Sequence, residues 1–384
     1  MKIKVFEVLS DTNIGGAGRL LSTRFALSNR DEFEENVILP RGSELEESFV
    51  SLGYTPFYLK YCINRSFDVR EIYNLFRYFK THRPDIVNSH GCLSARIAAK
   101  LARVPICIYT RHCAYDVEDI YKLGVIKSFV KKFTDSITDK IIAVANAAKE
   151  NLIDMGISEE KIEVIVNGVI GIERYSTEDR KRVRTELGIP ENAFVCGMCA
   201  RLEDCKGIDT LLRAARKLLR SNDDYYFVIV GKGSCAIDLR ELADALGISR
   251  NVRFCGFADD VTPYVNIFDV NINCSRGTET SSLALSEGMS IGLPCIASDW
   301  GGNPYMVRDG YNGFVFATDD FISLAEKIEM LRSDKDLYRK MSQNAYRRFC
   351  DELTAERMTR KTEELYSKLY TEVLHSNTAE AIVK

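Results

Sequence analysis

Short apolar runs alternate with amphipathic stretches along the whole chain. The apolar runs predict strands over 2–9, 36–39, 85–88, 106–109, 141–144 and 163–166, and again over 194–200, 226–231, 252–255, 270–273, 295–298 and 314–316. Apolar positions at helical spacing predict helices over 18–28, 69–81, 93–103, 146–155, 207–220, 237–246, 282–291 and 320–332. Alternating strands and helices are typical of parallel sheets with helices on both faces, so the fold class is α/β.

The series of strands restarts after about residue 190, which predicts two Rossmann-like, doubly wound domains. We place the first domain at 1–173 and the second at 191–349. The intervening 174–190 opens with a polar, aperiodic stretch and is predicted to be the linker. Ligands bind at the carboxyl ends of the strands in such sheets, so chemistry is expected in the loops that follow strands.

Two such loops suit an anion. Gly15 and Gly16 follow the first strand and open the first helix, where backbone N–H groups approach a ligand closely. A tight turn that only allows packing explains these glycines equally well. Arg201 and Lys206 follow the first strand of the second domain, beside a helix N-terminus, and this arrangement predicts a binding site for a diphosphate.

The stretch from Ser275 to Met289 lies between two predicted strands and holds two carboxylates. Ser281 or Ser282 is expected to cap the helix, which leaves Glu279 in the loop and Glu287 inside the helix. The N–H groups of 281–283, Leu283 included, are placed to meet phosphates. Two carboxylates so arranged can contact different ends of one polar ligand, although a helix dipole alone also favours an acid near its start.

The remaining histidines, cysteines and aspartates give weaker evidence of a functional site. His90 and His112 each follow a predicted strand, and a histidine in such a place is as often structural as functional. Cys196 and Cys199 have redox or zinc spacing but lie in an apolar run without a second cysteine pair, so we interpret them as buried thiols. Asp334 and Asp336 are interpreted as solvated surface rather than as a metal site.

Composition narrows the class of protein. The 384 residues carry a net charge of −3, which excludes a global field that attracts nucleic acid. The first residues alternate polar and apolar side chains, unlike a signal peptide, and no apolar run is long enough to cross a bilayer. With scattered cysteines, this predicts a cytoplasmic protein with reduced thiols.

Taken together, these stretches resemble the retaining GT-B glycosyltransferases of family GT4, of the bacterial polysaccharide and lipopolysaccharide type. The most specific match is the pair Glu279 and Glu287, followed by Gly292-Leu293-Pro294. Further matches along nearly the whole chain are the Gly15-Gly16 loop, Thr110-Arg111-His112, Ile141 to Ala145, Val166 to Val169, the segment from Arg201 to Gly207, Gly301-Gly302 and Asp309 to Gly313.

The resemblance implies two domains facing across a cleft, with a C-terminal helix within 350–384 packed back on the first. It also implies roles for individual residues. Glu279 contacts the donor sugar, Glu287 holds the ribose, Arg201 and Lys206 neutralise the diphosphate, Gly15 and Gly16 lie beside the phosphates, and His112 lies near the transferred sugar. The resemblance further implies that the base lies near Phe257, and that Ser281, Ser282 and Leu283 bind the donor.

Three positions depart from the family pattern. Thr280-Ser281-Ser282 replaces a common Gly-Phe-Gly, Tyr305 stands where a glutamate is common, and Ala145 replaces a serine. The first change keeps the backbone donors and adds hydroxyl groups, so it bears on sugar preference more than on activity.

The expected activity is transfer of a sugar from a nucleotide-diphosphate sugar to a glycan or lipid-linked acceptor in cell-surface polysaccharide synthesis. A UDP-sugar is expected rather than a GDP-sugar, although the residues do not identify the base. No cofactor or metal is expected, because Arg201, Lys206 and helix N-termini can stabilise the leaving diphosphate. The alternatives are a non-catalytic nucleotide-sugar or polysaccharide-binding protein on the same fold, and a GT-B sugar-nucleotide epimerase.

A basic segment suggests a possible contact with a membrane surface. Residues 60–140 hold 15 Lys and Arg against 8 Asp and Glu, a net of +7. Within them, 121–133 places Leu123, Ile126, Val130 and Phe133 at helical spacing among lysines. This pattern predicts either a helix facing the core or peripheral contact with an anionic membrane on its cytoplasmic side.

Overall fold

The computed structural model describes residues 2–13, 15–113 and 124–383. The chain divides into two compact units, the first formed by Met1–Gly168 with Ala355–Lys384 and the second by Val169–Thr354. Each unit is described by itself.

The first unit contains a parallel sheet, with seven strands among the described residues, in the order β3-β2-β1-β4-β5-β6-β7. The strands are β1 (Ile3–Leu9), β2 (Phe33–Pro40), β3 (Phe57–Leu59), β4 (Ile86–His90), β5 (Ile106–Arg111), β6 (Lys140–Ala143) and β7 (Ile162–Val164). The helices are α1 (Gly16–Leu27), α2 (Glu46–Ser51), α3 (Val69–His82), α4 (Leu93–Ala102), α6 (Gly124–Ile137), α7 (Asn146–Asp154) and α16 (Ala355–Val383).

The second unit repeats the design with a parallel sheet in the order β10-β9-β8-β11-β12-β13. Its strands are β8 (Phe194–Cys199), β9 (Tyr225–Val230), β10 (Val252–Gly256), β11 (Val270–Asn273), β12 (Cys295–Ser298) and β13 (Gly313–Phe316). Its helices are α8 (Thr177–Glu186), α9 (Ile208–Leu219), α10 (Ala236–Ala245), α11 (Thr262–Val265), α12 (Leu283–Ser290), α13 (Asn303–Met306), α14 (Phe321–Ser333) and α15 (Lys335–Glu352).

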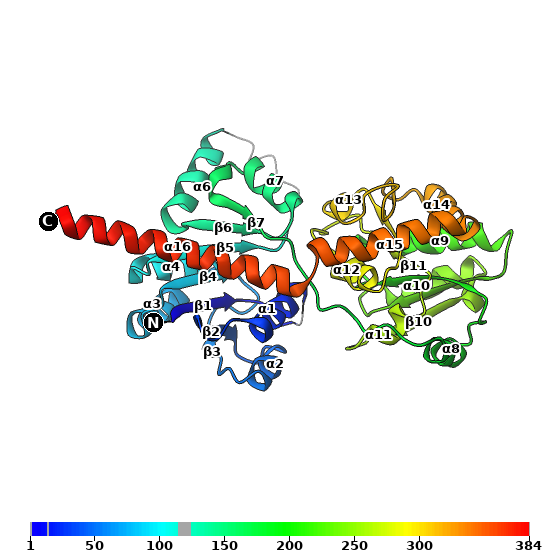
Figure 1. The fold of residues 1–384 in the computed structure, drawn as a ribbon, viewed down its shortest axis with the longest axis horizontal. Coiled ribbons are helices and arrows are strands. Elements are labelled where there is room, and N and C mark those ends of the chain that lie inside the picture. Colours follow the sequence, from blue (N-terminus) through cyan, green and yellow to red (C-terminus); the bar gives the residue numbers. More distant parts are fainter. Residues whose placement is uncertain (1, 14, 114–123, 384) are drawn as a thin grey trace. The chain divides into compact units, whose positions relative to one another are not determined.

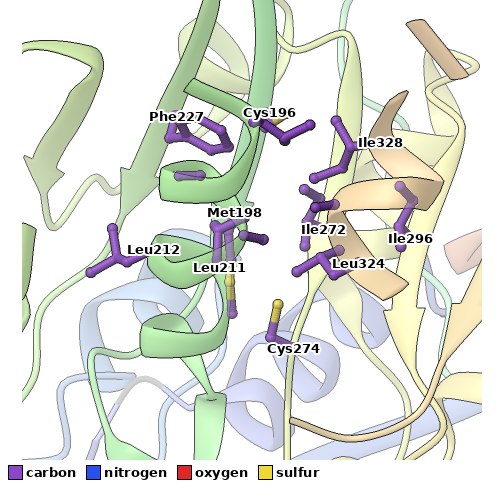
Figure 2. Packing of buried hydrophobic residues seen from close by; sticks show 14 of the residues in the cluster. Cys196, Met198, Leu211, Leu212, Phe227, Ile272, Cys274, Ile296, Leu324 and Ile328 are labelled. Atoms are coloured by element: carbon purple, nitrogen blue, oxygen red, sulfur yellow. The ribbon is translucent and has the colours of Figure 1, made fainter. Parts of the chain in front are cut away.

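The core of the second unit shows why these residues form these elements. Met198 and Ile272, from two neighbouring strands, face Leu211 of α9 and Leu324 of α14 (Figure 2). All four side chains are buried. Apolar residues on the strands are therefore covered by the apolar stripes of the amphipathic helices, as a parallel sheet requires.

In both sheets the strand order reverses once. The reversal lies between β1 and β4 in the first unit and between β8 and β11 in the second. Loops that leave two such neighbouring strands diverge at their carboxyl ends, which opens space for a ligand. The α/β fold class is confirmed, and these two reversals mark where each unit is expected to bind one.

The C-terminal helix returns to the first unit. Helix α16 begins at Ala355 and packs beside α1 (Figure 1). The stretch from 350 to 354 belongs instead to the end of the second unit, where α15 continues to Glu352.

The segment predicted as a linker has a different structure. Helix α8 lies inside 174–190, capped by the Ser176 hydroxyl, and belongs to the second unit. Arg184 on this helix is buried and donates hydrogen bonds to the carbonyls of Ala193 and Ile267 and to Asp269. The polar sequence of α8 looked like a linker because its charges either face solvent or are paired in this buried network.

Two smaller predictions can also be checked. Asp334 caps α15 by accepting hydrogen bonds from the N–H groups of Asp336 and Leu337, so the Asp-x-Asp pattern has a structural explanation. Within the described ranges, every helix is too short or too polar to cross a membrane.

Candidate active site

The loops at the strand reversal of the second unit bring Lys206 and Glu279 into direct contact. Lys206 follows β8 and immediately precedes α9, while Glu279 lies in the loop between β11 and α12. The Lys206 Nζ lies 2.9 Å from Glu279 Oε2, and both side chains are largely buried. The two residues predicted separately for the diphosphate and the sugar therefore form one ion pair.

Glu279 is held through a single oxygen. Besides Lys206, its Oε2 accepts hydrogen bonds from Asn273 Nδ2 at 3.1 Å and from Ser275 Oγ at 3.0 Å. Its Oε1 has no hydrogen-bond partner among the described residues. Three donors thus fix the orientation of the carboxylate and leave one oxygen available to accept a hydrogen bond from a ligand.

Two glycines shape the backbone of this loop. A Cβ at Gly301 would lie 2.1 Å from the carbonyl oxygen of Glu279, and a Cβ at Gly302 would lie 1.7 Å from that of Thr280. Gly301 also has φ +57, which other residues rarely adopt. The Gly301-Gly302 pair therefore allows close contact with the backbone of Glu279 and Thr280, and so helps to position the Glu279 loop.

Arg276 ties the same loop to its neighbours. Its guanidinium donates to Asp204 at 2.7 Å, to Asp209 at 2.9 Å and to Asp319 at 2.9 Å. The backbone N–H of Arg276 also bonds to the carbonyl of Cys205. These contacts join the Glu279 loop to the segment that carries Lys206.

The start of α12 has the predicted geometry. Ser282 is confirmed as the N-cap, with its hydroxyl accepting from the N–H of Leu285. Ser281 is half-buried beside Met306, Leu283 is the first helical residue, and Glu287 lies half-buried one turn further along. The N–H groups of the first helical turn have no partner within the helix backbone, so a helix start of this kind can accommodate an anion.

Two further predicted residues lie at the surface of the second unit. Arg201 is exposed directly after β8. Phe257, after β10, is 49% exposed, and the Lys232 ammonium lies 4.5 Å from the centre of its ring. An exposed aromatic ring beside a cation can stack on a base near a phosphate.

In the first unit, Gly15 caps α1 at the carboxyl end of β1. A Cβ at Gly15 would meet nothing within 4 Å, so this glycine is not required by packing. Gly16 begins the helix and is exposed. The open space beside Gly15 is compatible with a ligand and gives no support to a packing turn at this residue.

His112 follows β5 and contacts His90, the last residue of β4. The His90 Nδ1 and His112 Nε2 atoms lie 2.7 Å apart, and His90 Nε2 lies 2.7 Å from Glu7 Oε2. Both histidines line a small cavity of about 40 Å³ with Asn88, Thr110 and Asn167. Burial and the nearby His90 lower the pKa of His112 well below its usual range, so its ring is neutral at pH 7.

Sequence reasoning missed three residues here. Asn273 and Ser275 orient Glu279, and Glu7 anchors the two histidines. Two of the three had a signal in the sequence, since Asn273 and Glu7 are polar residues inside predicted strands. A buried polar group requires a partner, and both residues have one.

The Cys196 and Cys199 pair is not a site of reactive thiols. Burial raises the pKa of both thiols, which disfavours the thiolate that metal binding or disulfide exchange requires. Among the described residues, no three His, Cys, Asp or Glu side chains gather as metal ligands.

Comparisons with known proteins agree with this architecture. Residues 14–170 match the model of Glycosyltransferase Family 4, and residues 179–348 match that of Glycosyl transferases group 1. A relative in Escherichia coli is 28% identical over 95% of this chain and 97% of its own, and is named UDP-Gal:alpha-D-GlcNAc-diphosphoundecaprenol alpha-1,3-galactosyltransferase.

Solved structures show the same fold. Anabaena Alr3699/HepE, solved in complex with UDP and glucose, matches with a TM-score of 0.81 and 20% identity over 95% of this chain and 99% of its own. The lipopolysaccharide outer core galactosyltransferase WaaB matches with a TM-score of 0.70 and 20% identity over 96% of this chain and 100% of its own.

The fold and the two family models define a glycosyltransferase with the GT-B fold. The chain belongs to glycosyltransferase family 4.

Proposed function

We propose that this glycosyltransferase transfers a hexose from a UDP-sugar to a glycan or lipid-linked acceptor during synthesis of a cell-surface polysaccharide. The observation that carries the proposal is the Lys206–Glu279 pair, with Glu279 Oε1 unoccupied at the carboxyl ends of β8 and β11. A carboxylate oxygen that can accept a sugar hydroxyl, joined to a cation suited to a diphosphate, fits a sugar nucleotide. Two relatives support the donor, since one is named for UDP-Gal and the other was solved with UDP.

The proposed reaction is metal-independent and retains the anomeric configuration. As the bond between the sugar and the diphosphate breaks, negative charge grows on the departing oxygen, where Lys206, Arg201 and the start of α12 stabilise it. The acceptor hydroxyl attacks the anomeric carbon on the same face, and its proton passes to the leaving phosphate oxygen. Glu279 orients the sugar.

The acceptor is proposed to be a sugar on a lipid diphosphate. The relative that this chain covers almost completely is named for a diphosphoundecaprenol-linked GlcNAc. Such an acceptor lies at a membrane surface, so the enzyme would need a means of reaching that surface.

Helix α6 offers an apolar surface that shares only Phe133 with the predicted set of residues. Leu123 lies outside the described residues, and Ile126 and Val130 are half-buried. Val130 packs against a buried cluster that includes Ile141 and Ala143 of β6. The exposed apolar side chains are instead Val125, Phe129 and Phe133, which are 84%, 69% and 38% exposed. They recur every four residues, so they form one stripe along the helix.

Exposed lysines at 131 and 132 accompany this stripe. We propose that this face of α6 contacts anionic lipid. Co-sedimentation with anionic vesicles should fall at high salt and after Phe129→Ser with Lys131→Gln and Lys132→Gln. The double variant Lys335→Gln with Lys340→Gln removes equal charge from the second unit and should bind normally. Equal binding of the α6 variant would exclude this face as the contact.

The catalytic proposal is tested with a panel of donors. Thermal shift with UDP-glucose, UDP-galactose, UDP-GlcNAc and GDP-mannose identifies the donor, because a ligand bound only by the folded state raises Tm. Transfer to a polyprenyl-diphosphate GlcNAc is then measured with and without EDTA. We expect transfer from a UDP-sugar that EDTA does not reduce. Turnover of donor without acceptor would indicate an epimerase, and binding without turnover would indicate a sensor.

A further inference from the structure

The second unit has a cavity at the amino ends of three neighbouring strands. Phe194 begins β8, Asp269 immediately precedes β11, and Leu293 lies shortly before β12, and all three residues line the cavity. Its volume is about 600 Å³, within the range typical of sites for small ligands. The loops that carry Lys206 and Glu279 follow the carboxyl ends of β8 and β11. The cavity therefore lies at the opposite edge of the sheet from the candidate active site.

The cavity carries an excess of positive charge. Among the described residues that line it are five cationic side chains and a single carboxylate, that of Asp269. The cations are those of Arg174, Arg180, Arg332, Lys335 and Arg339. The first two lie just before and within α8, and the other three lie at the end of α14 and the start of α15. Two separate segments thus supply positive charge to one cavity, in a chain whose net charge is −3.

The carboxylate in the lining is already engaged. Asp269 Oδ2 accepts hydrogen bonds from Arg184 at 2.9 Å and from the backbone N–H of Val195 at 2.8 Å. Its Oδ1 lies 3.8 Å from Arg180 Nη2, which is too long for a hydrogen bond. Asp269 therefore mainly balances the charge of Arg184, and the cations that line the cavity remain in excess.

Two guanidinium groups in the lining have buried donors without a partner. Arg180 Nε and Arg332 Nη1 are buried, and neither has a hydrogen-bond partner among the described residues. The rest of the Arg332 guanidinium is engaged, since Nη2 lies 3.3 Å from Asp224 and the central carbon lies 4.4 Å from the centre of the Tyr225 ring. A buried donor on a charged group is costly unless it is paired, so both nitrogens favour an anionic acceptor beside them.

The other three cations are exposed. Among the described residues, neither Arg174 nor Lys335 has an ion-pair partner. Arg339 pairs with Asp336, three residues earlier on the same helix, at 2.8 Å. An exposed pair of this kind contributes little to stability, so Arg339 can exchange its partner for a ligand. Guanidinium groups bind phosphate through paired N–H donors, which makes phosphate the anion that this set of side chains suits best.

The two cationic segments are held in place by hydrogen bonds. The backbone N–H of Tyr175 donates to Asn266 Oδ1, and Asn266 Nδ2 donates to the carbonyl of Glu173, both at 2.8 Å. These bonds fix the backbone where the first segment begins. The Tyr338 hydroxyl on α15 donates to the backbone carbonyl that precedes β11, at 2.9 Å. The cavity is therefore preformed, and a ligand does not have to order its walls.

Part of the cavity is apolar. Four buried apolar side chains line it, those of Phe268, Ile291, Leu293 and Leu331. The half-buried rings of Tyr175 and Tyr338 also line it and can pack against a flat ring. A bare inorganic anion would leave this apolar surface uncovered, whereas the organic part of a larger molecule would bury it.

We propose that this cavity binds a small organic phosphate, that is, a phosphate monoester on a body the size of a sugar or a nucleoside. The phosphate accepts hydrogen bonds from Arg180 and Arg332, beside the positive charge of Arg174, and the body covers the apolar part. This site is separate from the donor site of the proposed function, and binding to it requires neither a sugar donor nor an acceptor.

Isothermal titration calorimetry with glucose 6-phosphate, AMP and inorganic phosphate tests the proposal. The first two carry a phosphate monoester on a sugar and on a nucleoside, so the tighter of the two identifies the body. We expect at least one of them to bind about tenfold or more tightly than inorganic phosphate, because burial of the body adds affinity. If neither organic phosphate binds, or if inorganic phosphate binds equally well, the proposal is wrong.

A double variant tests the location of the site. Arg174→Gln with Arg180→Gln removes two cations from the cavity, and Kd should rise about tenfold or more because charge-assisted hydrogen bonds are lost. The control is Arg220→Gln with Arg347→Gln. It removes equal charge from exposed residues of the same unit that do not line the cavity, and its Kd should be unchanged. Equal losses in both variants would show that net charge, rather than the cavity, holds the ligand.

A phosphate can also bind beside Lys206 in the candidate active site, and Lys206→Ala separates the two sites. We expect this variant to bind the organic phosphate as tightly as the natural protein does. Loss of binding in Lys206→Ala, with normal binding in the cavity variant, would place the ligand at the candidate active site and overturn the proposal. The titrations contain no nucleotide sugar, so their result stands whether or not sugar transfer is found. Thermal unfolding of each variant without ligand shows whether a loss of binding reflects misfolding.

Discussion

Each unit places one buried glutamate at its strand reversal, and the two carboxylates are used differently. Glu7 has both oxygens engaged, by Arg24 and Tyr366 on one side and by His90 on the other. Glu279 has three donors on Oε2, and its Oε1 has no partner among the described residues. A saturated carboxylate can only hold other residues in place, whereas a half-saturated one can also bind a ligand.

The difference follows from where each residue lies on its sheet. Glu7 is inside β1, so strands and helices surround it on every side and no ligand can reach it. Glu279 is in the loop after β11, beyond the end of the strand. The same residue type therefore serves structure in one unit and, on our proposal, recognition of the donor in the other.

The largest expected effect is a difference in how much each glutamate contributes to the stability of its own unit. Glu7→Ala leaves Arg24 and His90 buried without their shared acceptor, so we expect unfolding of the first unit to become easier by about 3–5 kcal/mol. Glu279→Ala should cost the second unit about 1–2 kcal/mol, because Lys206 can turn toward solvent. Hydrogen exchange in β1 measures the first unit, and fluorescence of the single tryptophan, Trp300, follows the second in urea. Equal losses would contradict the comparison.

Removing the partner of Glu279 should mainly affect activity. Lys206→Ala deletes the cation proposed to stabilise the leaving diphosphate, and we expect kcat to fall by about 10²-fold or more. Steady-state transfer assays measure this loss. The control Lys181→Ala removes an exposed cation of the same unit that pairs with Glu191, and it should retain the normal rate. A near-normal rate for Lys206→Ala would show that the leaving group is stabilised elsewhere.

Most of the fold could be predicted because short strands rich in apolar residues alternate with amphipathic helices. The exceptions are instructive. Strand β3, only Phe57–Leu59, is too short to show a period, and α8 has a polar sequence that hides the buried Arg184. In both cases the tertiary contacts, rather than a local pattern, decide the structure.

The residues that we propose to face a ligand could be singled out from the sequence, whereas the residues that support them could not. Glu279, Lys206 and Ser282 were found from spacing and from their positions after strands. The Lys206–Glu279 contact was not, because it joins residues 73 apart in the sequence. Asn273 and Glu7 were overlooked because a polar residue inside an apolar strand gives no indication of its partner.

A smaller effect should distinguish the two glutamates of the second unit. Glu287 lies in α12 and is proposed to accept ribose hydroxyls, which do not change during the reaction. We therefore expect Glu287→Ala to raise KM about tenfold with a smaller change in kcat, and Glu279→Ala to lower kcat more than it raises KM. Initial rates over a range of donor concentrations separate the two parameters. The reverse pattern would exchange the assigned roles.

The smallest expected effect concerns pH and the first unit. The pKa of His112 is lowered in the folded protein, by burial and then by His90. In the unfolded chain, a histidine binds a proton below about pH 6.5. The unfolded state therefore gains protons first as pH falls, and stability decreases below pH 6.5, by at most about 1.4 kcal/mol per pH unit from this residue.

The groups that face His112 limit what else titrates in this range. Among the described residues, the hydrogen-bonded neighbours are His90 of β4 and, through it, Glu7 of β1, Arg24 of α1 and Tyr366 of α16. The lowered pKa of Glu7 gives stability that is present above about pH 4.5 and is lost only at lower pH, outside the window from pH 7 to 5.

His112→Asn should therefore flatten the loss of stability between pH 7 and pH 5, as measured by urea unfolding with hydrogen exchange in β1. His82→Gln, a change at an exposed histidine, should leave the slope unaltered. An unchanged slope in His112→Asn would mean that His112 gains its proton in the folded protein as readily as in the unfolded chain.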